Sequence, residues 1–216
     1  MILIVTNEIH LDAINNIQKL YSYLRSVNIP FMTIRKCDPA ITKRTDITGI
    51  IIPGSSGNMR ISLDKIQPKL ELELYYLFHF PNLPVLGICH GCQFLMVYYG
   101  GSLIQYDTYL KGKLSTEFDL KSHMLFEGCE KIQDTHFHFH DLPIIDDSHS
   151  AATAETKHIK EIAWFTFRDN KRRACAFEFE KDRVFGLLFH PEARDDSHII
   201  IHNFYHKVCL AKGRKS

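Results

Sequence analysis

Hydrophobic residues alternate along the first part of the chain between short unbroken runs and longer stripes with helical spacing. The runs predict buried strands, and they lie at residues 2–5, 31–34, 47–52 and 84–88. The stripes predict helices, and they lie at residues 11–24, ending before Asn28-Ile29-Pro30, and at residues 70–78. An alternation of strands and helices is typical of a parallel sheet flanked by helices.

The pattern changes after Gly100-Gly101. Residues 102–141 show no clear apolar period, so we expect a less regular region there. Three strand-like segments predict an antiparallel group that returns to the sheet edge, and they lie at residues 162–168, 174–180 and 184–189. A last helix is expected over residues 197–210. The sequence therefore predicts a single α/β domain over residues 1–216, with a mostly parallel central sheet flanked by helices and a small antiparallel group near the C-terminal half.

Composition excludes several classes of protein. The chain has 216 residues, 45% of them hydrophobic, which is enough for a buried core, and its apolar runs stop far short of the roughly 20 residues that span a bilayer. Lys and Arg number 26 against 25 Asp and Glu, so bulk charge predicts neither a nucleic acid nor a membrane as partner. The apolar start of the chain is typical of a strand rather than a signal peptide, so we expect a cytoplasmic protein with reduced cysteines.

One cysteine stands where a strand is expected to turn into a helix. The fourth predicted strand runs through Gly87-Ile88-Cys89-His90-Gly91 into a helical stretch at residues 93–99. A thiol just before a helix is exposed by the turn, and its thiolate is favoured by the positive end of the helix dipole. Flanking glycines leave room for such a turn, as in the serine elbow of the α/β-hydrolases. A lone cysteine could equally be a small buried hydrophobe.

A base with an orienting carboxylate follows another predicted strand, at His190-Pro191-Glu192. His190 could take the thiol proton and later protonate a leaving amine. Glu192 could hold the imidazole tautomer and stabilise its cation. The tripeptide is weak evidence alone, but together with the elbow at Cys89 it predicts a nucleophilic site.

These segments together resemble the class I glutamine amidotransferase superfamily, which includes the γ-glutamyl hydrolases. The resemblance rests on residues 84–93, which contain Gly-x-Cys-x-Gly-x-Gln, on Gly100-Gly101 and on residues 189–192. It implies a flavodoxin-like α/β sandwich and a Cys-His-Glu triad that hydrolyses the side-chain amide of glutamine, or a γ-glutamyl bond, through a thioester. We expect a small-molecule substrate, no cofactor and no metal ion.

The resemblance also implies a role for each matching residue. Cys89 is the nucleophile, His190 the acid and base, and Glu192 its orienter. The backbone N–H groups of His90 and Gly54 would form the oxyanion hole, in which one donor contributes about 3 kcal/mol to lowering the barrier. Gln93 would contact the bound glutamyl group.

The reaction served by this site stays open at this stage. Ammonia released from glutamine would need a separate synthase partner, because the chain contains no synthase domain. Pro53-Gly54-Ser55 and residues 100–105 resemble the γ-glutamyl hydrolase branch, so a free-standing γ-glutamyl peptide or amide hydrolase is the alternative. A non-catalytic, regulatory amidotransferase-like protein is a third interpretation.

Two rival constellations remain. Cys89 and Cys92 form a C-x-x-C at a helix N-terminus, as in thioredoxin-like redox sites, although that motif does not explain the distant His190. His136, His138 and His140 alternate as in a strand, so three imidazoles share one face that could bind zinc or line the substrate.

Overall fold

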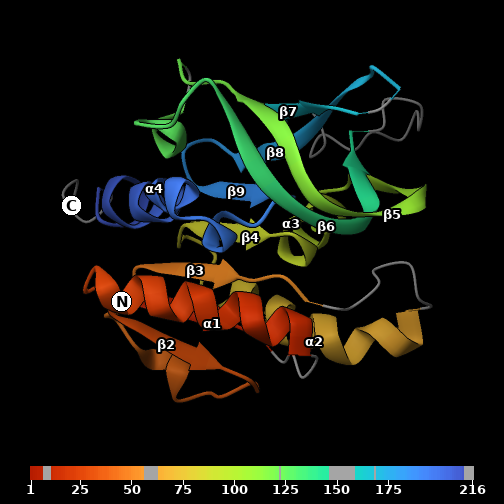
Figure 1. Ribbon diagram of the computed structural model, residues 1–216. Helices are drawn as coiled ribbons and strands as arrows, with labels where there is room; N and C mark the ends of the chain where they lie inside the picture. Colours follow the sequence, from red (N-terminus) through yellow and green to blue (C-terminus); the bar gives the residue numbers. More distant parts are fainter. Residues whose placement is uncertain (7–10, 56–62, 122, 146–158, 168, 212–216) are drawn as a thin grey trace.

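The computed structural model describes residues 1–6, 11–55, 63–121, 123–145, 159–167 and 169–211. Within these residues, nine strands form one sheet in the order β2-β1-β3-β4-β9-β8-β7-β5-β6. The parallel strands occupy the lower part of the view in Figure 1 and the antiparallel strands the upper part, with the two chain ends on the same side. No helix among the described residues is long and apolar enough to cross a membrane.

The parallel half carries the predicted strands and helices. Its strands are β2 (Phe31–Ile34), β1 (Ile2–Val5), β3 (Gly49–Ile52), β4 (Val85–Ile88) and β9 (Val184–Leu187). Its helices are α1 (Leu11–Ser26), α2 (Leu63–His79) and α3 (His90–Tyr98). Every residue of β1, β3, β4 and β9 is buried, because helices cover both faces of a parallel sheet. The α/β class is therefore confirmed, although α2 begins earlier than expected.

The antiparallel half is larger than expected. It contains β5 (Ser102–Phe118), β6 (Ile132–Ile144), β7 (Lys160–Thr166) and β8 (Arg172–Glu180). The prediction of a less regular region at residues 102–141 is wrong, since most of it forms the long hairpin β5–β6. The strand pattern of this segment is weak in the sequence because β5 shifts register between Gln105 and Leu110 and presents charged residues on its outer face.

Strand β9 lies in the middle of the sheet, so the prediction that its segment returns to the sheet edge is wrong. It pairs parallel with β4 on one side and antiparallel with β8 on the other. Strands β4 and β9 therefore end side by side at the carboxyl edge of the parallel sheet. The two segments that follow β4 and β9 therefore lie next to each other at this edge of the sheet.

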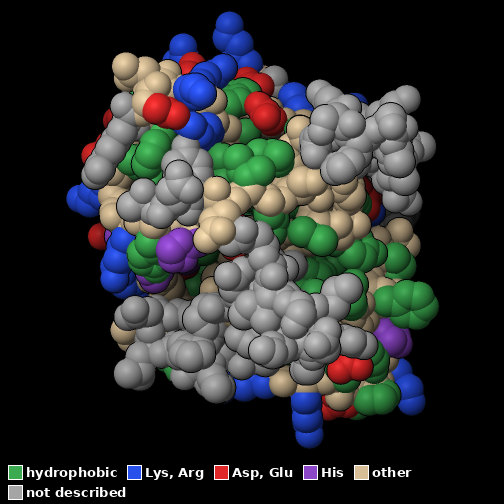
Figure 2. Space-filling model, turned by 90° about the vertical axis from the view of Figure 1, so that its right-hand side faces the viewer, with side chains coloured by type: hydrophobic (Ala, Val, Ile, Leu, Met, Phe, Trp, Pro, Cys, Tyr) green, Lys and Arg blue, Asp and Glu red, His purple; other side chains and the backbone are tan. Residues whose placement is uncertain are grey.

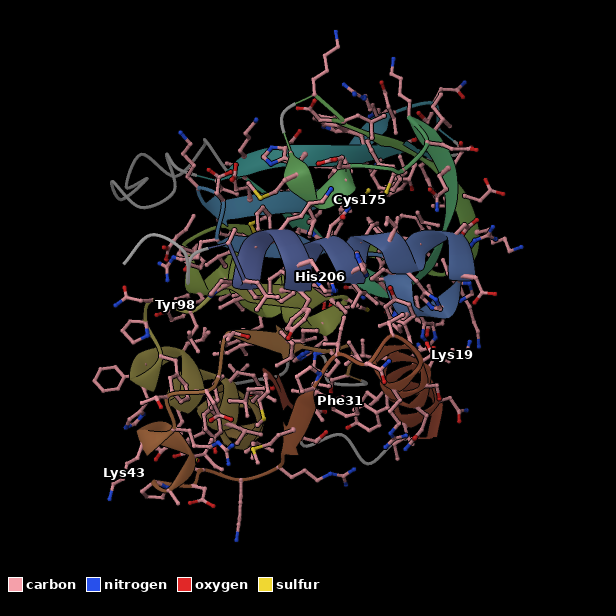
Figure 3. The ribbon with its side chains drawn as sticks, turned by 90° about the vertical axis from the view of Figure 1, so that its left-hand side faces the viewer. Lys19, Phe31, Lys43, Tyr98, Cys175 and His206 are labelled. Atoms are coloured by element: carbon pink, nitrogen blue, oxygen red, sulfur yellow. The ribbon has the colours of Figure 1, made fainter. Side chains whose placement is uncertain are left out.

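The last helix follows the expected bounds but changes its winding. The α-helix α4 (His198–Asn203) continues as a π-helical segment, Phe204–Cys209. Ile200, Phe204 and Val208 are buried along one side of it. Figure 3 shows this helix, with His206 labelled, running across the molecule between the two halves.

Candidate active site

Cys89 occupies a sharp turn between β4 and α3. Its backbone has φ 53° and ψ −105°, a conformation that a non-glycine residue rarely adopts. Helix α3 starts at the next residue, and the Cys89 N–H donates to the Leu187 carbonyl of β9 over 2.7 Å. The predicted strand-turn-helix elbow is confirmed, and its strain is typical of a functional position.

The elbow can form only with glycines beside it. A Cβ atom at Gly91 would stand 2.1 Å from the carbonyl oxygen of Ile52, and one at Gly87 would stand 2.5 Å from the carbonyl oxygen of Gly91. Both obstacles are backbone atoms that no rotamer change can move. The backbone of α3 therefore packs directly against the backbones of β3 and β4.

Replacing Gly91 by alanine is expected to destabilise the fold by about 3 kcal/mol or more, because the added methyl group must push α3 away from β3. Urea unfolding followed by circular dichroism measures this loss. Val97→Ala on the exposed side of the same helix is the control, with an expected change of about 0.5 kcal/mol or less. Equal stability of the two variants would contradict the packing described here.

His190 and Glu192 follow β9 and form a buried pair. Nδ1 of His190 lies 2.6 Å from Oε1 of Glu192, and the two residues are 2% and 3% exposed. The 3₁₀ turn Pro191–Ala193 sets the direction of the carboxylate. The backbone N–H of His190 donates to the carbonyl of His136 on β6 over 2.8 Å.

The imidazole and the thiol meet around Gly54. A Cβ atom at Gly54 would lie 2.8 Å from Cε1 of His190 and 3.5 Å from Cβ of Cys89, so both side chains contact this glycine. The Cys89 thiol donates to the carbonyl of His138 over 3.2 Å. Nε2 of His190 is buried and has no hydrogen bond of standard geometry within the described part of the chain. This nitrogen is the one that can exchange a proton with a reacting group.

The charges around His190 favour its protonated form. Burial has the largest effect and lowers the pKa of the imidazole, but the neighbouring Glu192 and Cys89 side chains raise that pKa, with a net result of about 10. The protonated form of His190 is therefore favoured next to the sulfur of Cys89.

The other predicted site residues lie around the thiol. His90 opens α3, and the first N–H groups of a helix have no partner within that helix. Gly54 follows β3 and is buried. Gln93 is buried one turn into α3, and its amide donates to the carbonyl of Asp141 on β6 over 2.7 Å. All six predicted residues are thus gathered at one end of the sheet, while their roles stay predictions.

Strand β6, which carries three alternating histidines, borders the site. The alternation of His136, His138 and His140 is confirmed, with Phe137 and Phe139 buried on the other face. No group of three or more potential ligands within the described residues is arranged to hold a metal ion.

Helix α1 also reaches the site, through Asn16. Nδ2 of Asn16 lies 3.5 Å from Nδ1 of His190. Nothing in the sequence singles out this residue, because its role depends on how α1 packs against the turn after β9.

Cys92 lies inside the core rather than at the site. It is 0% exposed, and a Cβ atom at Gly186 would stand 2.8 Å from its sulfur. Burial, together with the charges of Cys89 and Cys175, raises the pKa of the Cys92 thiol well above its usual value. A neutral, inaccessible thiol does not support the thioredoxin-like interpretation.

The structure thus defines an α/β protein with a cysteine at a strand-turn-helix elbow, beside a buried histidine–carboxylate pair at the carboxyl edge of its parallel strands. The family model described as "Glutamine amidotransferase class-I" matches residues 9–208 of this chain. The chain belongs to the class-I glutamine amidotransferase family.

Curated relatives are glutamine-hydrolysing GMP synthases. The chain is 29% identical over 174 residues to the enzyme of Borreliella burgdorferi strain N40, covering 79% of this chain and 30% of the relative. It is 27% identical over 198 residues to that of Staphylococcus aureus strain MSSA476, covering 90% and 33%. The chain thus spans about a third of the length of these relatives.

Solved structures share the fold. A protein from Thermoplasma acidophilum assigned as a GMP synthase subunit has a TM-score of 0.72 at 18% identity, with 98% of this chain and 94% of that chain covered. PurLQS from Thermotoga maritima has a TM-score of 0.65 at 17% identity, with 95% and 97% covered.

Proposed function

We propose that this protein hydrolyses the side-chain amide of glutamine to glutamate and ammonia, with Cys89 as nucleophile. The observation that carries the proposal is the buried row formed by Cys89, His190 and Glu192, in which the imidazole is 2.6 Å from the carboxylate and its pKa is raised to about 10. Membership of the class-I glutamine amidotransferase family supports the choice of substrate.

The reaction follows from the positions of these groups. The Cys89 thiolate attacks the amide carbon and forms a carbon–sulfur bond, while His190 gives its Nε2 proton to the leaving nitrogen. The carbon–nitrogen bond breaks, ammonia leaves, and a γ-glutamyl thioester remains on Cys89. Water then attacks the thioester, one water proton returns to His190, and glutamate is released with the thiolate restored.

Backbone donors stabilise the oxyanion in both steps. The N–H groups of Gly54 and His90 take this role in the proposal, because these residues flank the thiol at the end of β3 and the start of α3. Gln93 contacts the glutamyl group in the same proposal, from the first turn of α3.

The ammonia is proposed to pass to a separate synthase. The curated relatives are glutamine-hydrolysing GMP synthases about three times as long as the matching region, and PurLQS is one of the solved neighbours. A cytoplasmic location, where glutamine and such synthases occur, is part of this proposal.

Incubation of the purified chain with glutamine tests the proposal. Equal amounts of glutamate and ammonia are expected, and hydroxylamine should divert the thioester to γ-glutamyl hydroxamate on the way. A chain that binds glutamine without releasing glutamate, alone or with a synthase, would instead support the regulatory interpretation.

Replacing Glu192 by glutamine is expected to move the alkaline limit of activity to lower pH. The carboxylate is one of the groups that raise the pKa of His190 to about 10, so its loss lowers that pKa, and the imidazolium disappears earlier as the pH rises. The kcat/KM for glutamine between pH 6 and pH 11 measures the shift, which should exceed about one unit.

Glu178→Gln is the matched control, because Glu178 is a buried carboxylate 3.8 Å from another histidine, His123. Its profile should keep the alkaline limit of the wild type. An unchanged limit in Glu192→Gln would show that the carboxylate does not govern the His190 proton.

A further inference from the structure

Helix α1 brings an amide side chain to the imidazole of His190. Nδ2 of Asn16 lies 3.5 Å from Nδ1 of His190, and Asn16 is half-buried. The same ring nitrogen lies 2.6 Å from Oε1 of Glu192. Nδ1 of His190 thus faces two polar side chains, a carboxylate from its own turn and an amide from a helix 174 residues away along the chain.

A chain of contacts fixes α1 against the turn that carries Glu192. The ring of Tyr23, about two helical turns after Asn16, stacks on the ring of His198 with 4.2 Å between the ring centres. Nε2 of His198 lies 3.3 Å from the backbone carbonyl oxygen of Glu192. Leu20 of the same helix is fully buried in the core. The amide of Asn16 is therefore held in place beside the imidazole.

The hydrogen on Nδ1 of His190 decides which end of the amide can bind it. In the proposed reaction Nδ1–H donates to Glu192 in the imidazolium and also in the neutral ring that remains after Nε2 has given up its proton. Nδ1 is thus a donor throughout, and the group of Asn16 that suits it is the amide oxygen. A half-turn of the amide exchanges its nitrogen and oxygen and leaves the rest of the side chain in place.

The elbow and strand β6 supply further titratable groups around His190. Cys89 is, with Glu192, one of the groups that raise the pKa of His190. The rings of His136 and His138 lie 6.4 Å and 6.3 Å from the ring of His190. Burial has the largest effect on His136 and lowers its pKa, and the charge of His190 lowers that pKa further, so the neutral form of His136 is favoured.

Helix α1 contributes Lys19, one turn after Asn16, whose charge also lowers the pKa of His136. Figure 3 shows Lys19 on the upper side of α1. Figure 2, which looks onto the carboxyl ends of the parallel strands, shows histidine side chains at mid-height with lysine or arginine side chains beside them. Asn16 itself is uncharged, so an acidic residue at this position would add a negative charge directly beside Nδ1 of His190.

We propose that Asn16 is a positioning residue of the site, whose amide oxygen accepts a second hydrogen bond from Nδ1–H of His190 and holds the imidazole with Nε2 towards the sulfur of Cys89. The inference rests on the proposed hydrolysis at Cys89 and adds a residue from α1 to it. Asn16 acts through His190 and does not touch the substrate. The second acceptor stabilises the charged ring more than the neutral one.

Replacing Asn16 by leucine removes both polar atoms of the amide at nearly the same size. The variant should lose about fivefold to tenfold in kcat for glutamine and keep KM within about twofold, because the lost contact is with His190 alone. The alkaline limit of kcat/KM should fall by about half a unit, since the charged ring loses an acceptor. Asn16→Asp should instead keep kcat within about twofold at neutral pH and raise that limit by about one unit.

Asn15→Leu is the matched control, because Asn15 is the preceding residue of α1 and is exposed. Its kcat and alkaline limit should be those of the wild type. A role of Asn16 in folding alone would lower the activity of both Asn16 variants and move neither limit. That outcome overturns the inference, as does an Asn16→Leu variant with wild-type kcat and limit, or an equal change in Asn15→Leu.

A titration of the histidine ring separates this inference from the proposed function. Nitrogen-15 NMR of protein labelled in its histidines follows the protonation of His190 without substrate, and the signals of His190 are those absent from His190→Gln. The titration midpoint should move down in Asn16→Leu and up in Asn16→Asp, by about the same amounts as the alkaline limit. These shifts without any release of glutamate by the wild type would reject the proposed function and keep the role of Asn16, whereas release of glutamate with an unmoved midpoint would do the reverse.

Discussion

Replacing Cys89 by alanine is expected to reduce glutamine hydrolysis by about 10⁴-fold or more, to the background of the assay. Without the sulfur no thioester can form, and His190 and the oxyanion hole have no nucleophile to assist. Release of glutamate, measured over hours with stoichiometric enzyme, gives the residual rate. The variant should still fold, since alanine is small enough for the turn.

Cys92→Ala is the matched control on the same helix. This second thiol is fully buried in the core behind the elbow, so its loss should cost about 1 kcal/mol of stability and leave kcat/KM within about twofold. The opposite outcome, with Cys92 essential and Cys89 dispensable, would favour a redox role for the C-x-x-C motif and end the hydrolase proposal.

The parts of the site that the sequence predicts are those encoded by neighbouring residues. The elbow at Cys89 needs glycines at short range, and the clash distances at Gly87 and Gly91 show why. His190 and Glu192 are two residues apart and close their hydrogen bond within one 3₁₀ turn. Local patterns of this kind can be interpreted without knowing how the strands are ordered.

The parts that the sequence does not predict depend on contacts between distant segments. The carbonyl of His138 meets the Cys89 thiol 49 residues away along the chain, and this contact requires β6 to lie at its actual register beside β5. A register shift between Gln105 and Leu110 sets that position, and a shift of one residue exchanges the two faces of a strand. The three histidines are therefore visible in the sequence, but their place beside His190 is not.

The order of the strands in the sheet also depends on contacts between distant segments, so the sequence does not predict it. Strand β9 follows the four antiparallel strands β5 to β8 along the chain and nevertheless pairs parallel with β4. Apolar runs of equal length predict that each strand is buried, but they contain no information about its neighbour. The pairing is what brings His190 to Cys89.

Replacing Gly54 by alanine is the second substitution for which we expect a large loss of activity, because the added methyl group would disturb two parts of the site. The Cβ atom of an alanine would stand 2.8 Å from Cε1 of His190, so the imidazole would have to leave its place beside the thiol. The backbone N–H proposed for the oxyanion hole belongs to the same residue. Gly54→Ala is therefore expected to lower kcat/KM for glutamine by about 10²- to 10³-fold, the loss typical of one oxyanion donor.

Gly49→Ala is the control for the general effect of adding a methyl group at this strand. Gly49 is the first residue of β3, and Gly54 follows the end of the same strand. A Cβ atom at Gly49 would press on the sulfur of Cys209, far from the triad, so this variant should lose thermal stability and keep its kcat/KM. Gly54→Ala should instead lose most of its kcat/KM, because the obstacle at that position is the imidazole of His190 itself. Activity of Gly54→Ala within about tenfold of the wild type would mean that catalysis does not need His190 at its observed position. That result would contradict the proposal that Cys89, His190 and Glu192 form the catalytic centre.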